Sequence, residues 1–440
     1  MERMRTVLKC GMAEVDVTPP LNSSMPGYFR DRKSTGVLDP LYAKAITVET
    51  EGAAAVLVAI DAIDLPRRVV LGIRERIHSE TGIPQANIMV SATHTHTGPP
   101  VVTSSLMTAD EAYLQQLTER AADAAILAYR GSKEARIGFG CGYEADMAFN
   151  RRFWMKDGTV RMNPGIGNTD AVRPEGPIDP QVLVIRIDAV DGSSIGVVTN
   201  YACHTDTVGG TRYSADYPGE LSASLKRSLG GHVVSLFLMG ASGNINHIDV
   251  SGGWPVQPEH HKVMGRILAG EVLKTREKAR LADRVELGAA QAFFQVAYRK
   301  PSEEEAEEAR RRIGSETVNE VEKAFASELL LAYAEEEIFA DIEMQAIQLG
   351  PLAVVGCPGE LFVELGLAIK AASPFAYTAV NELCNGAAPG YVCTREAFEN
   401  GSYEPRITSN SRLPAETGEL FVRHAEELLG RIYANRTETS

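Results

Sequence analysis

The sequence predicts an α/β protein: a single large domain with mixed, largely buried β-sheets flanked by helices, and a site at the strand ends. Three observations support this prediction. Short runs such as 56–61 and 195–201 are apolar almost throughout, which is typical of strands covered on both faces. Segments with helical spacing, such as 67–81, follow several of these runs. Histidines and other polar residues come directly after the runs, at the edge where α/β sheets build their sites.

The composition is that of an ordinary globular protein with a sizeable core. The chain has 440 residues, of which 44% are hydrophobic and 23% are charged. Its formal net charge of −14 argues against a nucleic-acid partner, because such proteins need a basic face for phosphate. No tandem repeat or low-complexity linker interrupts the sequence. We therefore expect one domain over residues 1–440.

Targeting and redox signals are few. Residues 1–5 lead straight into a strand-like segment without a signal-peptide pattern, and no apolar run reaches the length of a membrane span. We expect a cytoplasmic protein that acts on a small-molecule substrate and has no membrane span. The sequence leaves open whether the protein forms a homo-oligomer. The six cysteines are scattered without a CxxC pair, so neither a disulfide framework nor a cysteine zinc knuckle is expected.

Strands and helices are expected along the whole chain, and residues 132–190 are expected to contain short strand-like pieces and a long irregular stretch. The expected strands cover 12–17, 41–50, 53–63, 87–90, 195–201, 233–239, two runs within 342–355, and 377–381. The expected helices cover 67–81, 110–129, 220–230, a charged segment over 302–340, 361–372 and 417–433. The order strand, helix, strand over 53–90 predicts a βαβ unit with a right-handed crossover.

The stretch 91–100 reads SATHTHTGPP and follows the strand expected over 87–90. Side chains two residues apart on a strand point the same way, so His94 and His96 are expected to face one side together. Two imidazoles on one side can provide two ligands to a metal, or one ligand and one general base. Two polar residues with local hydrogen bonds at a strand end are the alternative.

Further groups with useful chemistry occupy similar places. His204 follows a buried strand, Glu360 lies at a strand–helix junction, and Tyr391 and Tyr403 lie in a late loop. Two histidines and a carboxylate are a familiar ligand set for a catalytic zinc with an open position, where bound water becomes a usable nucleophile. Sequence spacing alone does not establish that these groups meet, so a metal hydrolase is one of several interpretations at this point.

Seven segments, taken in order, resemble the N-terminal catalytic domain of the neutral/alkaline ceramidase family. They are 91–99, 150–151, 202–204, 214–219, 240–246, 358–360 and 390–404. The resemblance implies one zinc ion held by His94, His204, Glu360 and Tyr391. Chain length and order also imply that the C-terminal β-sandwich domain of that family is absent from these 440 residues.

The resemblance also implies the roles of other residues. His96 would be the general base or acid, and Arg151 and Tyr403 would line the substrate carbonyl and stabilise the oxyanion. Asn246 stands where the family has a serine, so we expect direct attack by metal-activated water rather than an acyl-serine route. His247 and Asp249 are candidate ligands for a second metal. The alternative is that they only stabilise the loop in which they lie.

The function expected from residues and resemblance together is a zinc-dependent hydrolase of the amidohydrolase or esterase type. It would cleave an amide or ester bond in a small, polar, acylated substrate. The alternatives are a true ceramidase (an N-acylsphingosine amidohydrolase), a metal-dependent lyase or isomerase, and a non-catalytic metal-bearing ligand-binding protein. A true ceramidase requires a long apolar channel beside the metal, whereas a hydrolase of polar substrates requires a closed, charged pocket.

Overall fold

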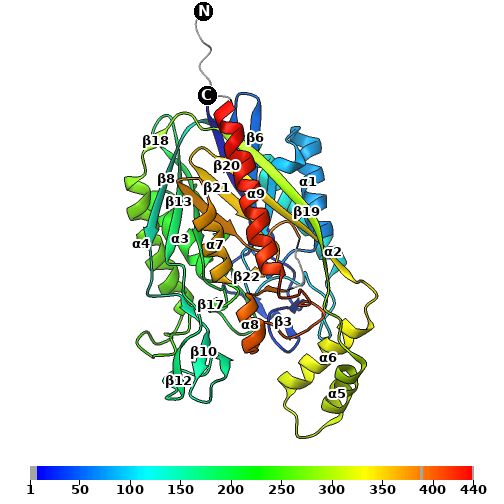
Figure 1. Ribbon diagram of the computed structural model, residues 1–440. Helices are drawn as coiled ribbons and strands as arrows, with labels where there is room; N and C mark the ends of the chain where they lie inside the picture. Colours follow the sequence, from blue (N-terminus) through cyan, green and yellow to red (C-terminus); the bar gives the residue numbers. More distant parts are fainter. Residues whose placement is uncertain (1–6, 387–389, 439–440) are drawn as a thin grey trace, which may run out of the picture.

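The computed structural model describes residues 7–386 and 390–438. Their two largest β-sheets enclose a shared core, with helices on the outside (Figure 1). The larger sheet contains, in spatial order, β16 (Val234–Met239), β14 (Ser194–Tyr201), β13 (Gln181–Ala189), β8 (Lys133–Tyr143), β1 (Lys9–Asp16), β5 (Tyr42–Thr50), β6 (Ala53–Ile60) and β7 (Ile88–Ala92), with β18 (Leu281–Ala282) beside β8. The smaller sheet contains β19 (Leu287–Ala297), β20 (Phe339–Leu349), β21 (Leu352–Gly356) and β23 (Tyr377–Asn381).

Helices cover the faces of the sheets that do not meet. One pair packs on β1, β5 and β6, a second pair packs on β8, β13 and β16, and a third pair covers the smaller sheet. In that order the pairs are α1 (Arg67–Thr81) with α2 (Glu111–Arg130), α3 (Asp216–Leu229) with α4 (His260–Lys278), and α7 (Val363–Ala372) with α9 (Thr417–Glu438). The predicted fold class, an α/β domain with mixed buried sheets flanked by helices, is confirmed.

The larger sheet is curled, and this curling positions the site. Its two halves are joined between β1 and β8 at only two residue pairs, Lys9 with Glu134 and Cys10 with Lys133. The halves can therefore turn toward each other, and the edge strand β16 contacts β7 at the opposite end of the strand order. The loops that follow β7, β14 and β16 consequently converge, although these strands are far apart in the sheet.

Three parallel strand pairs, each joined through a helix, lead into the region where the loops converge. The pairs are β6 with β7 through α1, β14 with β16 through α3, and β21 with β23 through α7. The predicted βαβ unit over 53–90 is thus present as a parallel pair. The chain leaves β7, β14 and β21 just before His94, His204 and Glu360, respectively.

The sequence analysis expected only short strand-like pieces within 132–190, but this stretch also contains the two long strands β8 and β13. In β8 every second residue from Gly138 to Gly142 is glycine, so the strand lacks the apolar alternation that identifies strands. A Cβ atom at Gly140 would lie 2.8 Å from the Thr275 side chain, and one at Gly142 would lie 2.0 Å from Glu271. The glycines are needed because α4 packs directly on this strand.

Two further differences concern helices. The charged segment over 302–340 forms two helices, α5 (Glu303–Gly314) and α6 (Glu320–Ala334), and α6 begins where Asn319 accepts a hydrogen bond from the Glu322 amide. The sequence analysis also did not predict α4 or β19. The two helices α5 and α6 project from the body beside the end of α2 (Figure 1).

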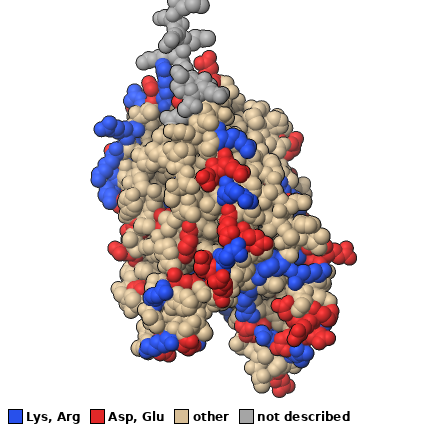
Figure 2. Space-filling model, in the orientation of Figure 1, with Lys and Arg blue, Asp and Glu red and all other residues tan. Residues whose placement is uncertain are grey.

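The surface and the thiols agree with the composition. On the face shown in Figure 2, acidic and basic side chains are interspersed among uncharged ones. Among the described residues, no helix combines the length and apolar character needed to cross a membrane. All six cysteines are free thiols, as expected from their spacing.

Candidate metal centre

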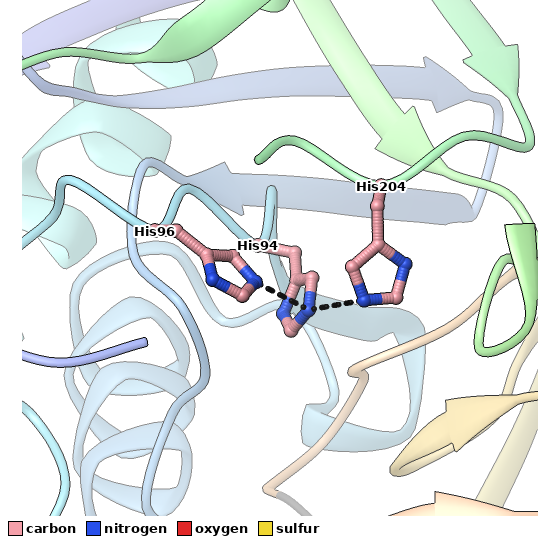
Figure 3. Close-up of side chains that lie close together, drawn as sticks. All are labelled: His94, His96 and His204. Carbon is pink, nitrogen blue, oxygen red and sulfur yellow. Dashed lines mark hydrogen bonds between the residues drawn. The ribbon is translucent and has the colours of Figure 1, made fainter. Parts of the chain in front are cut away.

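Three histidines from two separate segments meet at one point (Figure 3). The Nε2 atom of His94 lies 3.2 Å from Nε2 of His204 and 3.3 Å from Nε2 of His96. His94 has a φ of 68°, a left-handed conformation that is uncommon for residues other than glycine and is often found at functional sites. Strand alternation therefore does not explain why His94 and His96 face together, because β7 ends at Ala92 and the chain turns sharply afterwards.

The hydrogen bonds of the three imidazoles fix the tautomers of their neutral forms. Each ring lies with Nδ1 at 2.8–3.0 Å from a backbone carbonyl: His94 at Ile63, His96 at Gly27 and His204 at Ser242. A carbonyl can only accept, so Nδ1 carries the hydrogen in each neutral ring and Nε2 presents a lone pair. Three lone pairs that face one another at these distances repel unless a proton or a metal ion lies between them.

Glu360 completes a tight group of three ligand atoms. Its Oε2 atom lies 3.4 Å from Nε2 of His94 and 3.3 Å from Nε2 of His204, and it is buried without accepting a hydrogen bond from any described residue. Zinc–nitrogen and zinc–oxygen bonds of about 2.0–2.1 Å in a tetrahedron separate neighbouring ligand atoms by about 3.3 Å. The three distances between His94, His204 and Glu360 therefore fit one tetrahedral zinc ion.

The electrostatics of the centre favour a positive species. Burial by itself would lower the pKa of His94, but the Glu360 carboxylate outweighs this and raises the pKa of His94 to about 9. Burial and the adjacent Arg151 guanidinium lower the pKa of His204 to about 3. Burial opposes ionisation of Glu360, yet the two histidines hold its pKa well below the usual range. One positive charge is stabilised here, and a metal cation would experience the same field.

Tyr391 and Arg151 lie next to this group. Tyr391 belongs to β24 (Tyr391–Val392), which pairs in parallel with β22 (Glu360–Leu361) so that Tyr391 stands directly beside Glu360. The Arg151 guanidinium donates to the Tyr391 hydroxyl at 3.1 Å, to the Gly243 carbonyl at 2.7 Å and to Glu404 at 2.9 Å. Arg151 also lies 3.3 Å from Nε2 of His204. The structure thus brings together all seven residues that the resemblance implied, Tyr403 included.

A cavity of about 350 Å³ opens beside the centre. Its described lining includes His94, His96, Glu360, Tyr391 and Tyr403, whereas His204 and Arg151 lie behind it. The remaining walls are largely apolar, with polar side chains on one part. The apolar residues are Pro26, Phe29, Ile63, Val102, Leu106, Met107, Ala324, Phe325 and Leu383, the uncharged polar ones include Ser104, Thr408, Asn410 and Ser411, and the further charged ones are Asp64, Glu328, Glu404 and Arg406. The lining therefore combines apolar walls with charged side chains, and is neither a purely apolar channel nor a uniformly charged pocket.

His96 differs from the other two histidines in its surroundings. It lines the cavity, and its Nδ1 atom is 3.7 Å from the carboxylate of Asp206. Asp206 in turn accepts a hydrogen bond of 2.5 Å from the Tyr28 hydroxyl, and the Tyr28 ring packs edge-on against His96. Burial lowers the pKa of His96, so its neutral form predominates at neutral pH. A neutral imidazole with a free Nε2 can accept a proton.

Other residues singled out from the sequence lie outside the centre. Asp249 accepts hydrogen bonds from the amides of Ser251 and Trp254, which is the loop role. His247 packs against His260, but in the described residues it belongs to no cluster of three metal-binding side chains. Asn246 uses both ends of its amide, donating to Asn163 and accepting from Ile248.

The sequence analysis did not identify two carboxylates that lie near the centre. Asp64 lines the cavity, and burial raises its pKa to about 7. Glu382 is fully buried and accepts a hydrogen bond from the Ser242 hydroxyl. The carbonyl of Ser242 in turn accepts a hydrogen bond from Nδ1 of His204. Both follow a strand end, as His94 and His204 do, so the same positional signal was available for them.

Comparisons with known proteins agree with this geometry. Residues 8–219 match the sequence family described as neutral/alkaline non-lysosomal ceramidase, N-terminal. Two solved structures have the same fold: neutral ceramidase from Pseudomonas aeruginosa, with a TM-score of 0.75, and a ceramidase complexed with C2, with a TM-score of 0.73. Each is 18% identical in sequence, and the matches cover 96% of this chain and 74% and 75% of those chains, respectively. Residues 8–219 thus match the model of the neutral/alkaline non-lysosomal ceramidase family, and the chain as a whole has the fold of these two ceramidases.

Proposed function

We propose that the protein is a zinc-dependent hydrolase that cleaves an amide or ester bond in an acylated compound. The observation that carries this proposal is the group formed by His94, His204 and Glu360, whose ligand atoms are 3.2–3.4 Å apart beside a cavity. Fixed tautomers, an unpartnered buried carboxylate oxygen and a field that favours positive charge all support a bound cation. The family match over residues 8–219 supports hydrolysis as the reaction class.

In this proposal His94, His204 and Glu360 hold the zinc, and Tyr391 is the fourth ligand. The pairing of Tyr391 with Glu360 in one β-ladder supports that placement, as does the Arg151 guanidinium, which would stabilise a phenolate. Zinc at this point would act as a Lewis acid and would lower the pKa of a water molecule. A single metal is proposed, because Asp249 binds amides of its own loop and His247 belongs to no metal-binding cluster among the described residues.

The residues that face the cavity would handle the proton and the developing charge. His96 would accept a proton from the attacking water on Nε2, since its Nδ1 hydrogen is committed to the Gly27 carbonyl. It would then return the proton to the leaving nitrogen or oxygen. Tyr403 keeps its proton at neutral pH, because burial raises its pKa to about 12. Its hydroxyl would donate to the carbonyl oxygen of the substrate as negative charge develops there.

The cavity indicates which part of a substrate it would take. Its apolar walls fit an acyl chain or an aryl group, and the polar side chains in the same lining would meet a polar remainder. A volume of about 350 Å³ is near the lower end of the range for small-molecule sites. We therefore propose a compound with one apolar acyl group of moderate size. Ceramide, with two long chains, is the narrower alternative.

The test combines metal analysis with a substrate panel. The chain would be purified without added metal and its zinc content measured, together with His94→Ala and His204→Ala. His232→Ala is the matched control, because His232 is an exposed histidine remote from the centre whose ring lies 3.1 Å from the Ser194 carbonyl. The panel would contain N-acyl and O-acyl compounds with polar leaving groups, and a short-chain and a long-chain ceramide.

We expect about one zinc per chain in the wild type and the control, a loss of zinc in both site variants, and hydrolysis of monoacyl compounds. Full zinc content in His204→Ala would contradict the ligand assignment. A folded wild-type chain that binds no metal would contradict the whole proposal and favour a ligand-binding protein. Bound zinc without hydrolysis of any panel member would favour the lyase or isomerase alternative.

A further inference from the structure

Glu382 is a buried carboxylate that follows β23 and lies directly behind the metal centre. Its side chain is fully buried. Its Oε1 atom accepts a hydrogen bond from the Ser242 hydroxyl at 2.6 Å. Its Oε2 atom accepts from the Leu361 amide at 2.7 Å and from the Ser242 amide at 3.2 Å. One carboxylate therefore binds two separate loops, the one after β16 and the one after β21.

Each of these loops carries or holds a proposed zinc ligand. The Ser242 carbonyl lies 2.8 Å from Nδ1 of His204, so fixing Ser242 fixes the tautomer and the orientation of that ring. Leu361 directly follows Glu360, so fixing the Leu361 amide limits the movement of the Glu360 backbone. The loops also bind each other, since the Gly243 amide donates to the Leu361 carbonyl at 2.9 Å. Glu382 thus acts on two ligands at the same time.

The charge of Glu382 has no compensating side chain of the usual kind. The other fully buried glutamate near the site, Glu404, forms ion pairs with Arg151 and Arg152. In the described part of the chain, Glu382 has no such pair with a lysine or arginine, and its electrostatic neighbours are His94 and Glu360. Burying an unpaired charge is costly. Burial raises the pKa of Glu382 to about 8 in the absence of an ion. A divalent cation would favour the ionised form, so that Glu360 and Glu382 together would balance its charge.

We infer that Glu382 is a positioning residue for the metal centre, which increases its affinity for a divalent cation by orienting His204 and Glu360 and by balancing the charge of the ion. The inference rests on the proposed function, because it presupposes that the centre binds zinc. Loss of comparable residues behind metal ligands lowers metal affinity about 10- to 100-fold. Glu382→Gln preserves the shape but replaces one acceptor oxygen with an amino group, which cannot accept from Leu361 or Ser242.

The experiment measures the dissociation constant for Zn²⁺ by competition with a chelator, which requires no substrate. Wild type and Glu382→Gln would be compared with Ser242→Ala, which removes only the hydroxyl bond to Glu382. The control is Asp188→Asn. Asp188 is also a buried carboxylate, but it lies opposite Ser194 in the strand register, at the end of β14 that is remote from His204. Thermal unfolding of the metal-free proteins would separate an effect on metal binding from a general loss of stability.

We expect a 10- to 100-fold weaker affinity in Glu382→Gln, a smaller loss in Ser242→Ala and an unchanged affinity in Asp188→Asn. An unchanged zinc affinity in a folded Glu382→Gln would overturn the inference and leave the proposed function intact. If Glu382→Gln does not fold, Ser242→Ala decides: wild-type affinity there would overturn the inference. A wild-type chain that binds no zinc would overturn both, so the two failures are distinguishable.

Discussion

Phe325 lines both the proposed substrate cavity and a second cavity of about 550 Å³, as Arg406 also does, and its removal should change the preferred acyl length. Its ring lines both cavities, packs against Phe29 and Tyr403, and lies under the Arg406 guanidinium at 3.5 Å. Each methylene buried against apolar walls contributes about 0.8 kcal/mol, or about fourfold in kcat/KM if the chain is buried in the transition state. In the wild type this gain should stop when the acyl chain fills the first cavity.

Phe325→Ala should join the two cavities, so that the fourfold gain per methylene continues over additional carbons. The assay is kcat/KM along a series of acyl chain lengths on one leaving group. The control is Leu329→Ala, because Leu329 lies on the same helix but lines only the second cavity. If wild type and Phe325→Ala reached their plateau at the same chain length, the acyl group would not occupy this cavity and the reasoning would be wrong. Thermal unfolding checks that both variants remain folded.

Three other substitutions test separate parts of the structure. His96→Ala should retain about one zinc per chain while kcat falls about 10²- to 10⁴-fold, as expected for loss of a general base; loss of the zinc would instead make His96 a ligand. Tyr403→Phe should lower kcat about 10²- to 10³-fold with little change in zinc content, because it removes one donor to the oxyanion; an unchanged kcat would exclude that role. Glu343→Gln should lower the free energy of unfolding by about 3–5 kcal/mol, since Glu343 is buried and pairs with Arg74 at 2.6 Å and with Arg67 at 3.1 Å. Denaturant unfolding measures this loss, and a change below about 1 kcal/mol would show that the pairs are not maintained in solution.

The sequence was most informative where local chemistry decides the structure. The helix expected over 67–81 and the strand expected over 377–381 occur with those bounds. Both have a strong period, and α1 ends at Gly82 in the left-handed conformation, which glycine adopts readily. In the glycine-rich strand β8, close packing against α4 determines which residues can be accommodated. The hydrophobic alternation typical of a strand is therefore absent there, and the sequence did not predict the full strand.

The sequence by itself determined the class of fold, the strand ends that bear the histidines and Glu360, and the family resemblance in seven segments between residues 91 and 404. These features depend on residues close together in the chain. Only the tertiary structure decided that His94, His204 and Glu360 meet with their ligand atoms 3.2–3.4 Å apart. The physical reason is the short junction between β1 and β8, which lets the larger sheet curl until β16 contacts β7. The same convergence placed Glu382 behind two loops at once, which no spacing in the sequence indicates.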